Sequence, residues 1–312
     1  MSLKWKIFWI ASLALVIFFQ ACGMHSWEEL IVSTTDEKRM GREFDSLVRI
    51  GHKDVISAGE KLFIPSTDAE TALYNFYLDK GKEIVNAIDK KDFDALLTRE
   101  RLCRNNPNNQ NERVACNKNN FFEFKIITSK TLNAFAVPGG YVYFYTAILK
   151  NFQSESELMG VLGHEVGHVV LHHSRESMVK SAGASALINI FLGDGIAGLI
   201  GLLGANFWLM GNSRENEAEA DVMGFKYTDK IGISSRGLGA FFCRGLKSCD
   251  ANAAELECNS KEESSALDVF STHPPSCDRV NSNTKRMKEV NQNLPENRSV
   301  PSFTELVKAA GI

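Results

Sequence analysis

The stretch Val161-Leu-Gly-His164-Glu165-Val-Gly-His168-Val-Val170 decides how the rest of the chain is interpreted. It predicts one helix that carries His, Glu and His at positions i, i+1 and i+4. Because successive turns stack side chains three to four residues apart, His164 and His168 project from the same face of this helix. Two imidazoles held in this way can bind one metal ion, and Zn²⁺ accepts nitrogen ligands readily. Glu165 is displaced around the helix, so it is placed to handle a metal-bound water rather than to bind the metal.

This spacing is the H-E-x-x-H pattern of zinc peptidases. Ordinary residue frequencies produce it by chance in roughly one chain in a hundred of this length, so the motif alone is a hypothesis. A second histidine pair, His168 and His172, has the same spacing, but Val169 follows its first member and cannot act as a base. We therefore predict the site at the first pair. His172 and His173 are interpreted as helix-end residues, because cations suit the C-terminal end of a helix.

Length and composition are those of an ordinary globular protein. The 312 residues are 44% hydrophobic and 23% charged, which suits one large domain or two small ones. The formal net charge of −3 argues against a nucleic-acid binder, because such proteins neutralise phosphates with an excess of lysine and arginine. No nucleic-acid partner is therefore expected.

The N-terminus has the features of an export signal. Two lysines precede an apolar run over residues 7–19, and the small residue Ala21 stands before Cys22. This arrangement predicts a signal peptide over residues 1–21, since the apolar run is shorter than a membrane span of about 20 residues. Cys22 resembles the lipidated cysteine of a bacterial lipobox, although Phe19 stands where leucine is usual, and predicts attachment to a membrane surface. An uncleaved anchor and simple secretion are the alternatives.

The cysteine count agrees with export. Six of the seven cysteines remain besides Cys22, and an even number in an exported protein indicates up to three disulfides. Cys103 and Cys116 are the predicted pair, because they bracket a polar, turn-rich loop. The pairing of the other four stays open: Cys243, Cys249, Cys258 and Cys277. No C-x-x-C spacing occurs, so structural zinc on cysteines is not expected.

Helical periodicity precedes the motif and continues through it. Residues 33–48 predict one helix, and residues 72–98 predict two more. The central helix is predicted to begin near Ser154, which forms an S-x-x-E capping box with Glu157. Glycines stand directly before both motif histidines and would let another segment approach the metal closely.

A strand is predicted over residues 121–128 and a hairpin over residues 133–145, around Pro138-Gly139-Gly140. The second hairpin strand would enter the next helix. If its edge is exposed, Tyr141, Val142 and Tyr143 could accept a peptide as an added strand. An ordinary interior hairpin explains the pattern equally well.

Residues 182–210 are apolar and glycine-rich, and Asp194 interrupts them. We predict a buried or lid-like hairpin, because the segment breaks into pieces shorter than a membrane span. A hairpin that dips into a membrane is the alternative.

A helix rich in acids is predicted to open near residue 212. Glu217 and Asp221 lie four residues apart on one face. A solvated acidic face would be the default interpretation, but a zinc site still needs a third protein ligand and a carboxylate that orients a histidine. Glu217 and Asp221 supply both residue types, whereas Glu215 and Glu219 lie off this face and are interpreted as solvated.

His273 precedes two prolines, which hold the chain extended, and could point at the metal centre. A last polar helix is predicted over residues 278–293. Residues 294–312 are predicted to form a loosely attached tail.

Four motifs in this order resemble one family. They are Asn133-Ala-Phe-Ala-Val-Pro-Gly-Gly140, Leu162-Gly-His-Glu-Val-Gly-His168, Arg214-Glu-Asn-Glu-Ala-Glu-Ala-Asp221 and Ser271-Thr-His-Pro-Pro275. Together they resemble the HtpX-like and CAAX-prenyl-protease-like zinc metallopeptidases of peptidase family M48, with the periplasmic lipoprotein branch most similar. The resemblance spans roughly residues 30–290.

The resemblance implies a gluzincin site in which His164, His168 and Glu217 bind one Zn²⁺ ion. Glu165 would act as general base and acid, and Asp221 would support a ligand histidine.

His273 would either stabilise the oxyanion or occlude the metal in the idle enzyme, and Arg279 would stabilise the oxyanion or support the site. Two features differ from parts of the family. The membrane helices of its integral-membrane branch are not evident, and too few residues follow the last helix for the C-terminal repeats of some periplasmic members.

We therefore predict an α+β fold, predominantly helical, with a small sheet beside the active-site helix. An N-terminal helical arm (residues 22–70) would precede the metallopeptidase domain (residues 71–293) and the tail. The predicted protein is a zinc endopeptidase of the periplasm, lipid-anchored to the outer membrane, that cleaves unfolded or misfolded envelope proteins. The alternatives are a lipid-anchored, chaperone-like binding factor with an occluded zinc site and a structural lipoprotein with a fortuitous motif.

Overall fold

The computed structural model describes residues 28, 31–97, 117–183, 187, 212–253, 255–259, 272–290 and 293–312. The predicted signal peptide, Cys22, the Cys103–Cys116 pair and most of the 182–210 segment lie outside these residues.

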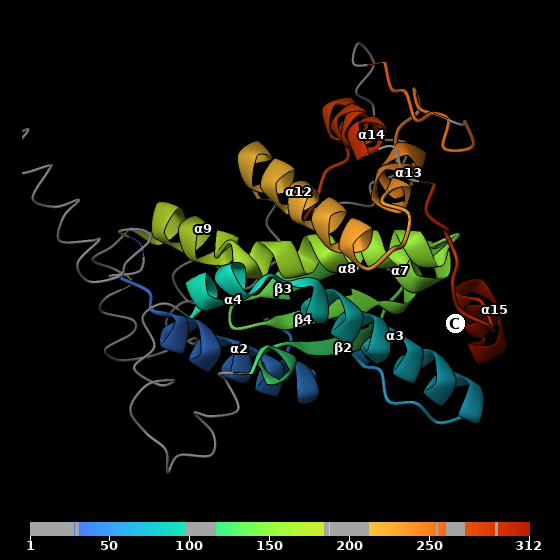
Figure 1. The fold of residues 1–312 in the computed structure, drawn as a ribbon. Helices are drawn as coiled ribbons and strands as arrows, with labels where there is room; N and C mark the ends of the chain where they lie inside the picture. Colours follow the sequence, from blue (N-terminus) through green and yellow to red (C-terminus); the bar gives the residue numbers. More distant parts are fainter. Residues whose placement is uncertain are drawn as a thin grey trace, which may run out of the picture.

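A four-stranded sheet forms the middle layer of the fold (Figure 1). Its strands are β1 (Lys61–Leu62), β2 (Glu123–Thr128), β3 (Ala134–Val137) and β4 (Tyr141–Tyr145). They lie in the order β1-β2-β4-β3, and only the β2–β4 pair is parallel. The predicted hairpin is present as β3 and β4. With the helices described below, the sheet confirms the predicted α+β class.

Strand β4 lies inside this sheet. It pairs with β2 on one side and with β3 on the other, so it has no free edge for a peptide. The prediction that Tyr141, Val142 and Tyr143 form a substrate-binding edge was therefore wrong. The edge strand at this end of the sheet is β3.

Helix α2 (Thr34–Arg49) covers one face of the sheet, and α3 (Asp68–Ala87) and α8 (Glu155–Val170) cover the other (Figure 1). Side chains of β4 alternate between these layers, as the pleat requires. Tyr143 packs in the core with α2, whereas Phe144 packs in the core with α3 and α8. Both faces of β4 are thus buried.

The N-terminal part of the chain belongs to this layered core. Helix α2 begins after Ser33, which forms a capping box with Asp36, close to the predicted helix start. Strand β1 pairs with β2. Residues assigned by sequence to an N-terminal arm therefore complete the sheet and cover one of its faces.

The remaining helices surround these layers. They are α4 (Lys90–Leu96), α6 (Lys118–Phe121), α7 (Thr146–Asn151), α9 (His173–Ala182), α12 (Arg214–Lys230), α13 (Arg236–Arg244), α14 (Cys277–Val290) and α15 (Phe303–Ala310). No helix in the described part of the chain is both long and apolar enough to cross a membrane.

The central helix α8 begins after Ser154, as predicted, and Ser154 Oγ accepts a hydrogen bond from Glu157 N. The second half of the predicted capping box is absent. Glu157 Oε2 instead accepts a hydrogen bond from Gln153 N at 2.8 Å and another from Arg244 Nη2 at 2.6 Å.

Helices α8 and α12 cross at very short range. A Cβ atom on Gly163 would lie 3.0 Å from Gly224 Cα, and one on Gly167 would lie 2.9 Å from Met223 Cβ. Larger side chains at either glycine would push the helices apart. The small residues beside the motif histidines therefore allow the close approach of α12, which carries Glu217 and Asp221.

The C-terminal segment is docked, so the prediction of a loosely attached tail was wrong. Ser156 N donates a hydrogen bond to Glu296 O at 2.9 Å, and Ser234 N donates one to Pro295 O at 2.8 Å. Phe303 and Val307 lie one turn apart on α15 and are both buried. These two apolar side chains give α15 a face that packs against α3.

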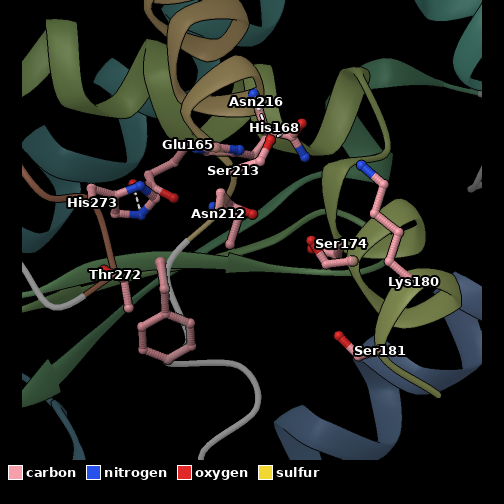
Figure 2. Close-up of a pocket in the computed structure, with 13 residues that line it drawn as sticks. Glu165, His168, Ser174, Lys180, Ser181, Asn212, Ser213, Asn216, Thr272 and His273 are labelled. Carbon is pink, nitrogen blue, oxygen red and sulfur yellow. Dashed lines mark hydrogen bonds and ion pairs between the residues drawn. The ribbon is translucent and has the colours of Figure 1, made fainter. Parts of the chain in front are cut away.

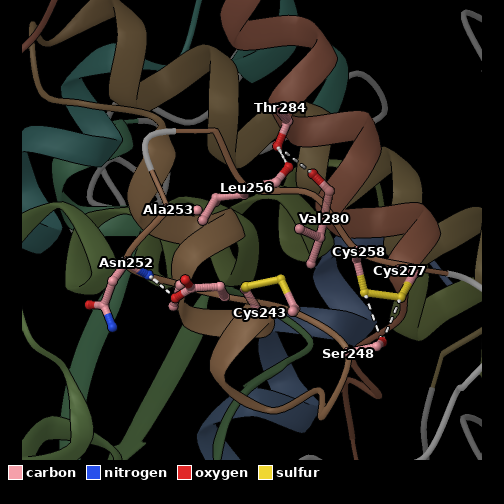
Figure 3. Close-up of a disulfide and its surroundings, with 12 residues drawn as sticks. Cys243, Ser248, Asn252, Ala253, Leu256, Cys258, Cys277, Val280 and Thr284 are labelled. Atoms are coloured by element: carbon pink, nitrogen blue, oxygen red, sulfur yellow. Dashed lines mark hydrogen bonds between the residues drawn. A yellow bond between two sulfur atoms is a disulfide. The ribbon is translucent and has the colours of Figure 1, made fainter.

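Two disulfides pair the four cysteines that the sequence left open. They are Cys243–Cys249 and Cys258–Cys277. The second disulfide joins the first residue of α14 to the loop that follows α13, and Ser248 lies beside it (Figure 3). It therefore fastens the helix that carries Arg279.

Candidate metal centre

Four side chains converge between α8, α12 and the segment before α14. His164 and His168 come from α8, Glu217 comes from α12, and His273 precedes α14. One donor atom from each side chain lies within 4.8 Å of the donor atoms of the others, and all four side chains are buried. The structure thus brings together four residues that the sequence selected.

The donor atoms form a small polyhedron. The Nε2 atoms of His164 and His168 are 3.0 Å apart, and each lies 3.4 Å from a carboxylate oxygen of Glu217. His273 Nδ1 lies 3.2 Å from His164 Nε2 and 3.0 Å from Glu217 Oε1. Four ligands placed tetrahedrally about 2.0–2.1 Å from a zinc ion would be roughly 3.3 Å apart. These separations therefore fit one ion of this size.

The opposite nitrogen of each motif histidine faces a second side chain. His164 Nδ1 lies 2.9 Å from Asp221 Oδ1, and His168 Nδ1 lies 2.8 Å from His173 Nδ1. With protons on both Nδ1 atoms, the two Nε2 lone pairs face each other at 3.0 Å. A cation between them removes this repulsion, so the residues present fit a metal ion.

Asp221 is held in place by Arg279. Arg279 Nε and Nη2 donate hydrogen bonds of 2.8 and 2.7 Å to the two carboxylate oxygens of Asp221, and Nη1 lies 3.0 Å from Glu217 Oε2. The guanidinium carbon lies 3.9 Å from the centre of the Phe242 ring. Arg279 thereby orients Asp221 and places a positive charge behind Glu217.

Burial and charge shift the protonation of these groups in opposite directions. Burial opposes the charged form of His164, but Asp221 and Glu217 raise its pKa to about 9. Burial and the neighbouring His164 hold the pKa of His168 well below its usual range. The two adjacent histidines therefore differ strongly in basicity.

The carboxylates beside them stay ionised. Burial alone would raise their pKa values, but Arg279 lowers the pKa of Asp221 to about 2, and His273 and the motif histidines lower the pKa of Glu217 far below its ordinary range. Two buried anions thus face the cluster of imidazoles.

Glu165 borders a cavity of about 190 Å³ that opens beside His168 and His273 (Figure 2). Its Oε1 lies 3.1 Å from His273 Nε2, and its buried Oε2 accepts no hydrogen bond from any described residue. Two residues of the edge strand β3, Phe135 and Ala136, also line this cavity. A peptide beside β3 would therefore pass the free carboxylate oxygen.

Sequence reasoning missed the role of His173 and Glu219. His173 does not lie at the C-terminal end of the motif helix, where the sequence placed it, because α8 ends at Val170 and His173 is the first residue of α9. Its side chain is buried against His168, and its Nε2 lies 3.2 Å from Glu219 Oε2. Glu219, interpreted as solvated, is 63% exposed yet makes this contact, whereas Glu215 is exposed as expected.

Helical spacing could not reveal this contact. His173 lies five residues after His168, which is off the face that a continuous helix would present. The intervening His172 has φ of 57°, in the left-handed region, and turns the chain back. A backbone conformation that few non-glycine residues adopt therefore creates the contact.

Comparison with known proteins agrees with this geometry. A family model described as Peptidase family M48 matches residues 108–287, which is more than half of the chain. The chain belongs to peptidase family M48. The resemblance predicted from the four motifs is thus confirmed, and the family is one of metal-dependent hydrolases of peptide bonds.

Several curated relatives share this region. Metalloprotease YcaL of Escherichia coli (strain K12) is 32% identical over 50% of this chain and 59% of its own length. The beta-barrel assembly-enhancing protease of Yersinia pestis is 30% identical over 59% of this chain and 38% of its own length. Metalloprotease LoiP of Escherichia coli (strain K12) is 29% identical over 53% of this chain and 62% of its own length. The chain thus spans less than two thirds of each of these relatives.

Proposed function

We propose that this protein is a zinc-dependent endopeptidase. The observation that carries the proposal is the convergence of His164, His168 and Glu217 beside a buried carboxylate, Glu165, that borders a cavity. These three residues would hold the ion, as the M48 resemblance implies. A zinc ion bound there would polarise the scissile carbonyl and lower the pKa of a water to about 7.

Glu165 would move the proton. Its Oε2 is buried and has no competing donor among the described residues, and its Oε1 lies 3.1 Å from His273 Nε2. It would take the proton of the attacking water and return it to the leaving amine. Asp221 would keep the Nδ1 proton of His164 and so leave its Nε2 free for the metal.

His273 would close the site in the resting protein. Its Nδ1 lies among the donor atoms, whereas a catalytic zinc site keeps one position open for water or substrate. The His273 side chain would therefore withdraw before hydrolysis. Once withdrawn it would be placed to stabilise the oxyanion, because it would still border the cavity.

The substrate would lie extended along β3 rather than along β4. Strand β3 is the sheet edge beside the cavity, and an extended peptide can add to such an edge through main-chain hydrogen bonds. Unfolded segments meet this requirement and folded domains do not. We therefore favour unfolded or misfolded envelope proteins as substrates. This choice agrees with the name of the relative from Yersinia pestis, a beta-barrel assembly-enhancing protease.

The N-terminal pattern supports a location outside the cytoplasm. Export through the signal at residues 1–21 and lipidation of Cys22 would tether the enzyme to a membrane surface, with the periplasmic side of the outer membrane favoured. The two disulfides agree with an oxidising compartment.

The decisive experiment replaces the proposed base. Glu165→Gln should retain one zinc per chain by elemental analysis but hydrolyse an unfolded protein substrate about 10²- to 10⁴-fold more slowly. Glu215→Gln, an exposed position on α12, is the matched control and should cleave like the wild type. Undiminished hydrolysis by Glu165→Gln would refute the proposed mechanism.

A second candidate function is a lipid-anchored, chaperone-like binding factor. The position of His273 among the donor atoms favours it, because a permanently occluded zinc would have no catalytic activity. His273→Ala separates the two functions. Peptide hydrolysis by the wild type or by this variant would indicate a peptidase, whereas stoichiometric zinc without turnover in wild type and variant would indicate a binder. A purely structural lipoprotein would contain no zinc.

A further inference from the structure

The two histidines of the motif rest on different supports. His164 faces a buried carboxylate, Asp221, which Arg279 holds with two hydrogen bonds. His168 faces a second imidazole, His173, which in turn contacts the exposed carboxylate of Glu219. The partner of His164 is thus a buried carboxylate, whereas His168 is linked through His173 to a carboxylate exposed to solvent.

The proton positions along this chain follow from the metal. If His168 binds the ion through Nε2, its proton must sit on Nδ1. His173 Nδ1, 2.8 Å away, must then accept this proton in a hydrogen bond, so His173 carries its own proton on Nε2. That proton points to Glu219 Oε2 at 3.2 Å, where a carboxylate accepts it. His168, His173 and Glu219 therefore each have a single hydrogen-bonding role that is compatible with a metal on His168 Nε2.

The backbone keeps His173 in this position. His172 adopts the left-handed conformation between the two helices, and its Nδ1 lies 2.8 Å from Glu37 Oε2. Arg175, in the first turn of α9, donates hydrogen bonds to Glu37 at 2.5 Å and to Thr34 at 3.1 Å. These contacts with α2 fasten the start of α9, so the His173 ring has little freedom to leave His168.

We propose that His173 and Glu219 are positioning residues that select the Nδ1–H form of His168 and orient its Nε2 toward the metal. This role rests on the proposed zinc site, and neither residue touches the substrate or the ion. Partners of this kind affect metal affinity by about 10- to 100-fold in other metal sites. Glu219 should contribute less than His173, because its carboxylate is exposed and water replaces it in part.

The test measures zinc affinity by competition with a chromophoric chelator, using the whole protein. His173→Phe keeps an aromatic ring but removes the acceptor, so it should weaken zinc binding about 10- to 100-fold. His173→Asn places an amide oxygen near the former Nδ1 and should restore most of the affinity. The visible spectrum of the Co²⁺-substituted protein should change for His173→Phe and remain close to wild type for His173→Asn.

Glu219 supplies a second, independent measurement on a surface side chain. Glu219→Gln retains an oxygen acceptor and should bind zinc like the wild type, whereas Glu219→Ala should bind several-fold more weakly. Glu215→Ala, exposed on the same helix, is the control and should show no change. If His173→Phe fails to fold, the comparison of Glu219→Ala with Glu219→Gln decides, and equal affinities overturn the inference.

The outcomes separate this inference from the proposed function. Equal zinc affinity and equal Co²⁺ spectra for wild type and His173→Phe would overturn the positioning role and leave the zinc peptidase intact. A wild-type protein that binds no zinc would overturn the proposed function and the inference with it.

Discussion

Glu155, the first residue of α8, and Glu217, in the first turn of α12, are both buried carboxylates, yet their surroundings differ. Glu155 lies 2.9 Å from Lys80 Nζ and accepts hydrogen bonds of 3.0 Å from the backbone nitrogens of Arg298 and Ser299. Glu217 faces three imidazoles and the Arg279 guanidinium. Both have a lowered pKa, although burial alone would raise it.

The lowered pKa therefore does not distinguish a structural carboxylate from one in a metal centre. Around Glu155, the Lys80 ammonium and two backbone N–H groups all donate to the carboxylate. These donors satisfy its charge, so no metal ion is needed there. Around Glu217, one nitrogen of each of three imidazoles and a carboxylate oxygen lie within 4.8 Å of one another, an arrangement that a cation can complete. The convergence of several metal-binding atoms, rather than a lowered pKa alone, distinguishes this site from the surroundings of Glu155.

The comparison predicts that the loss of Glu155 acts on the fold. Glu155→Ala leaves Lys80 and two backbone donors without their shared acceptor, so it should lower the free energy of unfolding by about 3 to 5 kcal/mol. Urea unfolding of the metal-free protein measures this change. Glu289→Ala, exposed on α14, should stay within about 0.5 kcal/mol of the wild type.

The folded fraction of Glu155→Ala should still bind zinc with wild-type affinity. If Glu155→Ala instead loses zinc while keeping its stability, Glu155 would belong to the metal centre, as Glu217 does, and the prediction would be wrong.

A second structural carboxylate extends the comparison through pH. Burial alone would raise the pKa of Glu37, but Arg175 and His172 lower it from the ordinary value of 4.5 to about 2. Because the folded-state pKa is the lower one, this stabilisation is fully present above about pH 4.5 and is lost as the pH falls toward 2. It amounts to about 3 kcal/mol, since one pKa unit corresponds to about 1.4 kcal/mol.

Stability of the metal-free protein between pH 5 and 2 tests this prediction. Glu37→Gln should be less stable than the wild type at pH 5, and the difference should shrink as the solution is acidified. A constant difference across this range would show that the charge of Glu37 contributes nothing to the contact between α2 and α9.

Asp221 should behave in the opposite way to Glu155 and Glu37. Asp221→Asn keeps the size of the side chain but weakens the acceptor for His164 Nδ1, so zinc affinity should fall about 10- to 100-fold. Stability of the metal-free protein should change less than in Glu155→Ala. Chelator competition and urea unfolding on the same sample separate the two effects. A loss of stability larger than that of Glu155→Ala would place Asp221 with the structural carboxylates.

Local patterns predicted most elements that carry the site. The start of α8, the hairpin of β3 and β4, and the helix with Glu217 and Asp221 depend on interactions within a few residues, namely a cap, a Pro-Gly-Gly turn and helical spacing. The sequence alone predicts all four residues that converge at the candidate metal centre, because their side-chain chemistry and order along the chain suit a zinc peptidase.

Contacts between distant residues were predicted poorly. The sequence did not reveal that β4 pairs on both sides, because alternation within a strand says nothing about its neighbours. The docked C-terminal segment depends on backbone groups of residues 295 and 296 that meet the loop between α12 and α13 and the start of α8. Backbone hydrogen bonds of this kind leave no side-chain signature.

The amino-acid sequence by itself determined the donor chemistry, namely two histidines and a base on one helix and two carboxylates on one face of another. Only the tertiary structure decided which side chains contact the opposite nitrogens of the two motif histidines and orient them. Asp221 and Arg279 are 58 residues apart, and they meet at His164 because α12 and α14 pack together. His173 reaches His168 because His172 reverses the chain and α2 holds the start of α9. The physical reason is that helical spacing sets the direction of neighbouring side chains, whereas orientation of a ligand depends on groups that only packing brings within hydrogen-bond distance.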